Sequence, residues 1–215
     1  MKPKHFRALA LVAALAAAGW RAAPAAAQGH THSHGGSTVE RPDTSRWTEA
    51  DADFMSSMIG HHAQAIVMSR LAETHGASAA VQTLAARIIN AQEDEIATMQ
   101  RWLRIRGLPV PDAAPMHHDH GKGADHALMP GMLTPEQLAE LDAARGKEFD
   151  RLFLTYMIQH HRGATEMVSK LFGSWGAGQD ETVFKFASDV NVDQTTEIAR
   201  MQRMLASVIF DTSIP

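Results

Sequence analysis

The stretch FMSSMIGHHAQAIVM, residues 54–68, recurs as FLTYMIQHHRGATEM at residues 153–167. Both copies carry Phe, Met-Ile, His-His, Ala and Met at the same spacing. At about 100° per residue, Phe54, Met58, His62 and Ala65 fall on one side of a helix. This is the apolar period of a helix that buries one face. Each copy therefore predicts a helix with histidine in its buried stripe.

A second pattern follows each of these helices. QEDEIATMQR, residues 92–101, recurs as QTTEIARMQR at residues 194–203, again with a helical period. The copies are 99 residues apart in the first pattern and 102 in the second. We interpret them as two repeated helical hairpins. Burial of their four apolar stripes predicts an all-α fold, a four-helix bundle, and no alternating strand pattern competes with it.

Capping and breaking residues set the expected boundaries. Thr48 and Thr134 begin capping-box patterns, and Pro135 suits the first position of a helix. The expected helices span residues 48–74, 78–106, 134–172 and 180–207, with Gly146 a weak point in the third. They make one bundle domain, 47–207, in which a His/Met/Pro linker, 108–133, joins a first hairpin, 47–107, to a second, 134–207.

The first residues resemble a leader for export. Lys2, Lys4 and Arg7 precede an apolar run, and a small-residue pattern ends at Ala27. This order is typical of a cleaved signal peptide, here residues 1–27. Residues 28–46 are polar and rich in His, Gly and Ser, which predicts a disordered tail. We therefore expect an exported protein, periplasmic or secreted, with no other membrane segment.

The composition limits the partners and the metal ligands that we expect. The net charge is −4 and no basic block is present, so nucleic acid is an unexpected partner. The chain has 13 His, 12 Met and no Cys. A soft or borderline metal ion would therefore be held by imidazole and thioether groups, with carboxylates in support.

The helical projection places His62 and His161 in the middle of their apolar stripes and His61 and His160 at the rims. Glu95 and Glu197 interrupt the stripes of the partner helices, where a carboxylate needs a partner. Pairing with the neighbouring imidazole would orient a metal-binding histidine. We expect one metal site in each hairpin. The first draws on His61, His62, Met58, Met68, Met99 and Glu95, and the second on His160, His161, Met157, Met167, Met201 and Glu197.

Imidazole with thioether favours Cu(I), and zinc is the weaker alternative. Flexible histidines add weak, unselective sites suited to Cu(II). They are His30, His32 and His34 in the tail and His117, His118, His120 and His126 in the linker, where Met116 is a further candidate ligand. A structural interpretation stays open, in which buried His–Glu pairs specify the bundle without metal. No Ser-His-Asp, Cys-His or Glu-x-x-His arrangement indicates an enzyme.

These residues together resemble the domain-of-unknown-function family 305. The resemblance covers about residues 47–206. It rests on both His-His patterns, the pattern that begins Gln92-x-x-Glu95, MPGMLTPEQL at residues 129–138, and Phe149-Asp150-x-x-Phe153. It implies a ferritin-like helical fold, export and, as in copper-binding members of the CopM type, copper buffering or delivery alongside other copper-handling proteins. The second half departs from the pattern at Arg162-Gly163.

Overall fold

The computed structural model describes residues 46–113 and 128–210. All of them belong to one compact unit, residues 40–215. The expected leader, nearly all of the tail, and the tail and linker histidines with Met116 lie outside the described residues. The helices are α1 (Glu49–Arg70), the short 3-10 helix η1 (Leu71–Glu73), α2 (Ala79–Ile105), α3 (Pro135–Ala143), α4 (Gly146–Gly173) and α5 (Glu181–Phe210). The described ranges contain no strand, which confirms the all-α prediction.

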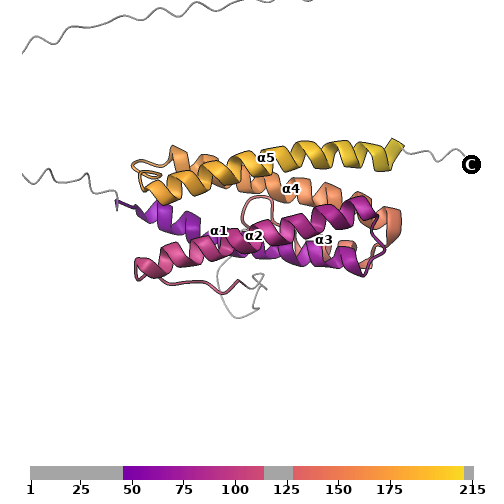
Figure 1. The fold of residues 1–215 in the computed structure, drawn as a ribbon, viewed down its shortest axis with the longest axis horizontal. Coiled ribbons are helices and arrows are strands. Elements are labelled where there is room, and N and C mark those ends of the chain that lie inside the picture. Colours follow the sequence, from indigo (N-terminus) through magenta and orange to yellow (C-terminus); the bar gives the residue numbers. More distant parts are fainter. Residues whose placement is uncertain (1–45, 114–127, 211–215) are drawn as a thin grey trace, which may run out of the picture. The chain divides into compact units, whose positions relative to one another are not determined.

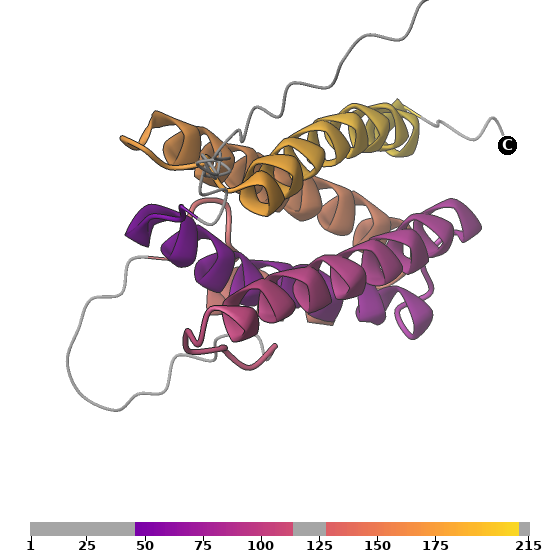
Figure 2. The same ribbon diagram turned by 60° about the vertical axis from the view of Figure 1, so that its left-hand side comes forward.

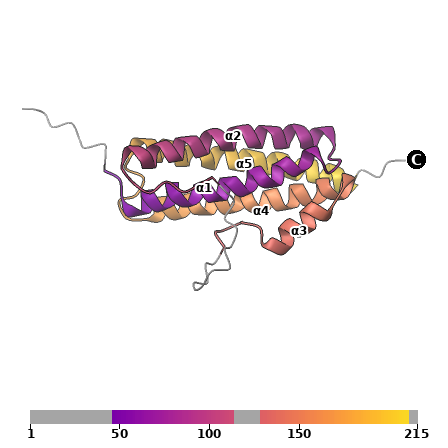
Figure 3. The same cartoon turned by 90° about the horizontal axis from the view of Figure 1, so that it is seen from below.

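The bundle consists of two helical hairpins that meet along their first helices. Helices α1 and α2 form one hairpin, α4 and α5 the other, and α1 packs against α4 (Figure 1). Figure 2 shows the hairpins as two layers, and Figure 3 shows α3 on the outside of the bundle, next to α4. Within the described ranges, no helix is long and apolar enough to cross a membrane.

Capping groups start two helices where the sequence predicts. The Thr48 backbone N–H donates to Asp51 Oδ2 over 2.7 Å, and the Asp51 N–H donates back to the Thr48 hydroxyl. Thr134 and Gln137 make the same reciprocal pair at α3. Each box satisfies N–H groups that a helix leaves without partners at its first turn.

The single third helix predicted over residues 134–172 is wrong, because the chain breaks into α3 and α4. Ala144 and Arg145 are extended, and Gly146 has a φ of 60°, a conformation that costs glycine little. The Gly146 N–H donates to the His75 carbonyl over 2.8 Å. The break therefore gains a hydrogen bond to the turn between α1 and α2, and that tertiary contact offsets the lost helical turn.

Two buried aspartates at equivalent positions tie each hairpin to the other. Asp51 in α1 accepts the Gly178 N–H over 2.7 Å, in the turn of the second hairpin. Asp150 in α4 accepts the Ser78 N–H over 3.1 Å, at the start of α2. Because both carboxylates are almost fully buried, each depends on the turn that it binds.

The core divides into two apolar clusters, one toward each end of the bundle. We call them the Met58 cluster and the Met157 cluster, after one buried member of each. The first joins the N-terminal half of α1 to the C-terminal half of α4 and also contains Met55 and Met99. The second joins the opposite halves and also contains Met68 and Met201. Helices α1 and α4 are therefore antiparallel.

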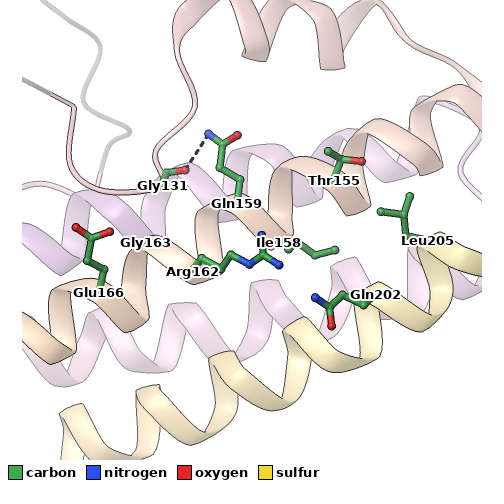
Figure 4. Close-up of a pocket in the computed structure, with 9 residues that line it drawn as sticks. All are labelled: Gly131, Thr155, Ile158, Gln159, Arg162, Gly163, Glu166, Gln202 and Leu205. Atoms are coloured by element: carbon green, nitrogen blue, oxygen red, sulfur yellow. Dashed lines mark hydrogen bonds between the residues drawn. The ribbon is translucent and has the colours of Figure 1, made fainter.

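The end of the predicted linker packs on the bundle. We call residues 129–133 the Pro130 loop; its Met132 and Leu133 are buried. The Gln64 side chain accepts the Leu133 N–H over 2.8 Å and donates to the Leu133 carbonyl over 3.1 Å. On the other side, a Cβ added to Gly163 would lie 1.9 Å from the Pro130 carbonyl oxygen. Figure 4 shows Gly131 of this loop beside Gln159 of α4.

We therefore expect Gly163→Ala to displace the Pro130 loop and to destabilise the fold by about 1–3 kcal/mol, the usual cost of overpacking. Chemical denaturation measures the change. Gly173→Ala is the matched control, because a Cβ there meets nothing within 4 Å. If both variants unfold at the same denaturant concentration as the wild type, the loop does not depend on the space at Gly163.

Candidate metal centre

The four histidines of the His-His patterns lie in the middle of the bundle, between the two clusters. His61, His62 and His161 have no exposed surface and His160 has 1%. His61 and His160, predicted at the rims of their apolar stripes, are as buried as His62 and His161. The rim of α1 is the surface that packs against α4, so the second hairpin covers it. The His61 and His160 rings lie 3.9 Å apart, centroid to centroid.

Backbone carbonyls fix the first two imidazoles. His160 Nε2 lies 3.0 Å from the His61 carbonyl oxygen, and His61 Nε2 lies 3.0 Å from the Pro130 carbonyl oxygen. Because a carbonyl oxygen only accepts, each histidine must donate from Nε2. The remaining ring nitrogen, Nδ1, then carries a free lone pair.

Carboxylates face the other two imidazoles, as the sequence predicts. His62 Nε2 lies 2.7 Å from Glu95 Oε2, and His161 Nε2 lies 2.8 Å from Glu197 Oε2. Only the second pair is aligned as a hydrogen bond; in the first, His62 Nε2 and Glu95 Oε2 have no hydrogen-bond partner despite the short distance. Each pair joins the two helices of one hairpin.

The Nδ1 atoms of all four histidines are buried and have no hydrogen-bond partner. A buried polar atom without a partner costs about 1–3 kcal/mol, so such atoms are rare in stable folds. Here four acceptors of one kind occur within one layer of the core. Histidines that bind metal donate their other ring N–H to a carboxylate or carbonyl. His61, His160 and His161 are arranged in that way.

Burial keeps the two central histidines neutral. Loss of hydration lowers the pKa of His61 to about 3, with a further lowering by His62, against a raising effect of the hydrogen bond to Pro130. Burial also lowers the pKa of His160 well below its usual value, and the other three histidines add to the effect. A neutral imidazole is the form that binds metal.

The methionine sulfurs predicted for each site fall into different clusters. Met58 and Met99 are fully buried in the Met58 cluster, one helical turn from His62 and Glu95 respectively. Met157 and Met201 have the same relation to His161 and Glu197 in the Met157 cluster. Met68 is buried among the residues of the Met157 cluster, and the partly buried Met167 packs against the Met58 cluster. Each of these two therefore lies away from the other methionines predicted for its site.

Two further observations limit the kind of metal site that the bundle can contain. Among the described residues, no three His, Asp or Glu side chains converge as a group that could hold a metal ion. A cavity of about 600 Å³ on the α4–α5 face lies elsewhere; polar side chains such as Thr155, Gln159 and Arg162 line it, and none of the predicted ligands does (Figure 4). A metal ion in the bundle would therefore need sulfur ligands and a site without a large open cavity.

Sequence reasoning missed the residues that hold His61 in place. These are Pro130, whose carbonyl accepts from the imidazole, and Gln64 and Gly163, which seat the Pro130 loop. Gln64 and Gly163 occupy equivalent positions in the two His-His patterns. This difference between two otherwise similar patterns was the one signal in the sequence that could have revealed the loop. A single loop contacts both copies, so it needs a different residue on each.

The lowered pKa values predict acid sensitivity of the metal-free protein. The unfolded chain binds protons at histidine below pH about 6.5, whereas folded His61 stays neutral down to pH about 3. The contribution of these histidines to the free energy of unfolding is therefore fully present above pH 6.5. It is lost as the pH falls, by about 1.4 kcal/mol per pH unit for each such histidine. Urea unfolding at several pH values with a chelator present measures this slope. The same slope in His61→Gln/His160→Gln would contradict the assignment.

Comparison with known proteins places the chain in a family. The sequence profile described as "Domain of unknown function (DUF305)" matches residues 51–205. Among curated proteins, none matches.

Several solved structures share the fold. A DUF305 protein of Streptomyces coelicolor, assigned as secreted, is 28% identical over 74% of this chain and 92% of its own, with a TM-score of 0.61. A DUF305 fragment from Deinococcus radiodurans is 26% identical over 74% and 97%, with a TM-score of 0.62. CopM in its Cu(II)-bound form is 30% identical over 73% and 96%, with a TM-score of 0.57. With most of its described residues inside the profile, the chain belongs to the DUF305 family.

Proposed function

We propose that the bundle binds a soft metal cation, with Cu(I) favoured over Zn(II), in the layer of four histidines. The observation that supports this most directly is the set of four buried Nδ1 atoms without hydrogen-bond partners. A neutral imidazole with a free lone pair in a dry site is a ready ligand for copper.

A purely structural role accounts for half of this arrangement. His–Glu and His–carbonyl hydrogen bonds satisfy three of the four Nε2 atoms, and His62 Nε2 lies 2.7 Å from Glu95. They leave every Nδ1 atom buried and unpaired, and a structural polar layer gains nothing from such atoms. A bound cation would give such an atom a partner, so the metal-binding function accounts for more of the geometry.

Thioethers one helical turn away supply the additional ligands. In the first hairpin these are Met58 and Met99, with Glu95 orienting His62. In the second they are Met157 and Met201, with Glu197 orienting His161. Thioether sulfur favours Cu(I) over harder divalent ions. Sulfur ligands are also consistent with the absence of three converging His, Asp or Glu groups in the described part of the chain.

In the cell, we propose that the protein is an exported copper binder that buffers or delivers the ion, in the periplasm or as a secreted protein. Support comes from structures of CopM described as bound to Cu(I), Cu(II) and silver, and from the assigned secretion of the Streptomyces relative. The histidines of the tail and linker, outside the described residues, would add weaker Cu(II) sites. Other copper-handling proteins are the expected partners.

Titration with Cu(I) under anaerobic conditions tests the proposal on residues 40–215 with the four linker histidines replaced by asparagine. We expect Met58→Leu/Met99→Leu to weaken Cu(I) binding at least about tenfold, because it removes sulfur while keeping apolar volume. His62→Gln should have a comparable effect, since it removes an imidazole. Competition with a chromophoric Cu(I) chelator measures each affinity.

Two variants serve as matched controls. Met55 is fully buried in the same cluster and is not a proposed ligand. His75 is buried, but both of its ring nitrogens have partners in Thr74 and Asp142. Met55→Leu and His75→Gln should keep the wild-type affinity. If the parent protein, residues 40–215 without the linker histidines, binds no Cu(I), the structural alternative holds instead.

A bound ion should also stabilise the fold. At one hundred times Kd, a ligand that binds only the folded state adds roughly 2.7 kcal/mol. For a chain of this size we expect the melting temperature to rise by roughly 5–10 °C. Calorimetric melting with and without Cu(I) measures the shift. An unchanged melting temperature, together with tight binding, would place the bound metal outside the bundle.

A further inference from the structure

An acidic groove lies between α2 and α5. Its volume is about 430 Å³. The charged side chains that line it are Asp94 and Glu95 from α2 and Glu181, Lys185, Asp189 and Asp193 from α5. Lys185 pairs with Asp189, so most of the negative charge is unbalanced.

The carboxylates of the groove act on one another. Partial loss of hydration raises the pKa of Asp193, and Glu95, Asp189 and Glu197 raise it further by repulsion. Such crowding concentrates negative potential in a cleft whose walls are protein, which increases the local concentration of cations.

The groove leads to an unpartnered buried group. Glu95 lines the groove and lies 2.7 Å from Nε2 of His62, a fully buried residue. Neither nitrogen of the His62 ring has a hydrogen-bond partner, and Glu95 Oε2 also lacks one. In the second hairpin the equivalent His161–Glu197 contact is a hydrogen bond. The unsatisfied pair is therefore the one beside the acids.

The acids occur on one side only. With the 102-residue offset of the second pattern, the positions equivalent to Asp94, Asp189 and Asp193 are Thr196, Arg87 and Ala91. The two hairpins share the His and Glu residues of the centre but differ in the charges around them. The repeated fold does not require an acid at these positions, because the equivalent positions carry Thr, Arg and Ala.

We propose that the acidic groove between α2 and α5 captures the metal cation from solution and passes it to the His62 side of the centre. The inference rests on the proposed metal binding and adds the path by which the ion reaches the centre from solution. Long-range attraction raises the rate at which the ion arrives, while the ligands of the centre set how tightly it is held. The first hairpin would therefore be loaded before the second.

Stopped-flow mixing of the full chain with aqueous Ag(I), in chloride-free nitrate buffer, tests the route. Trp20, Trp47 and Trp175 are replaced by phenylalanine, so that fluorescence reports on Trp102, three residues from Met99. We expect Asp94→Asn/Asp193→Asn to lower the association rate constant roughly three- to tenfold at low ionic strength. The difference should shrink as added nitrate screens the groove.

Glu73→Gln/Asp112→Asn is the matched control, because it removes the same charge from exposed positions outside the groove. It should change the rate by less than about twofold. Calorimetric titration with Ag(I) gives the affinity of each variant. Equal rates in the two variants, with Ag(I) bound by both, would overturn the groove as a route and leave the metal centre standing. Absence of Ag(I) binding to the parent chain would overturn the centre itself.

Discussion

The contact between α1 and α4 governs the rest of the structure, because it encloses imidazoles rather than aliphatic groups. His160 donates to the His61 carbonyl, and the two rings lie 3.9 Å apart. Removing these rings from water costs free energy unless every polar atom finds a partner. A carbonyl or a carboxylate accepts a hydrogen bond from Nε2 of His61, His160 and His161. The four Nδ1 atoms have no hydrogen-bond partner, and the proposed metal binding depends on these unpaired atoms.

The polar layer also organises the apolar core. It divides the buried side chains into two clusters, and each cluster contains residues of all four long helices. At the two ends, Asp51 and Asp150 fasten the helix of one hairpin to the turn of the other. Because the hairpins touch mainly through α1 and α4, these end contacts help to fix their relative position. They also hold α2 and α5 in the places from which Glu95 and Glu197 reach the histidines.

Near-symmetry makes the differences between the halves informative. The Pro130 loop can cover only one side of the α1–α4 contact, so Gln64 binds it while Gly163 makes room for it. The acidic groove is likewise lined by Glu95 of one His–Glu pair and not by Glu197 of the other. Two sites with similar ligands would thus experience different surroundings. In electrostatic terms, the first side attracts a cation more strongly.

The sequence alone determined the helices, their pairing and the His62–Glu95 and His161–Glu197 contacts, because helical period and capping act within a few residues. It could not show that α3 separates from α4, since Gly146 breaks the helix in favour of a bond to distant His75. Nor could it show that His61 and His160 are central. A helical projection identifies one buried face, whereas tertiary packing adds a second where the hairpins meet. The orphaned Nδ1 atoms follow from that second face, because only the assembled fold decides which ring nitrogen finds a partner.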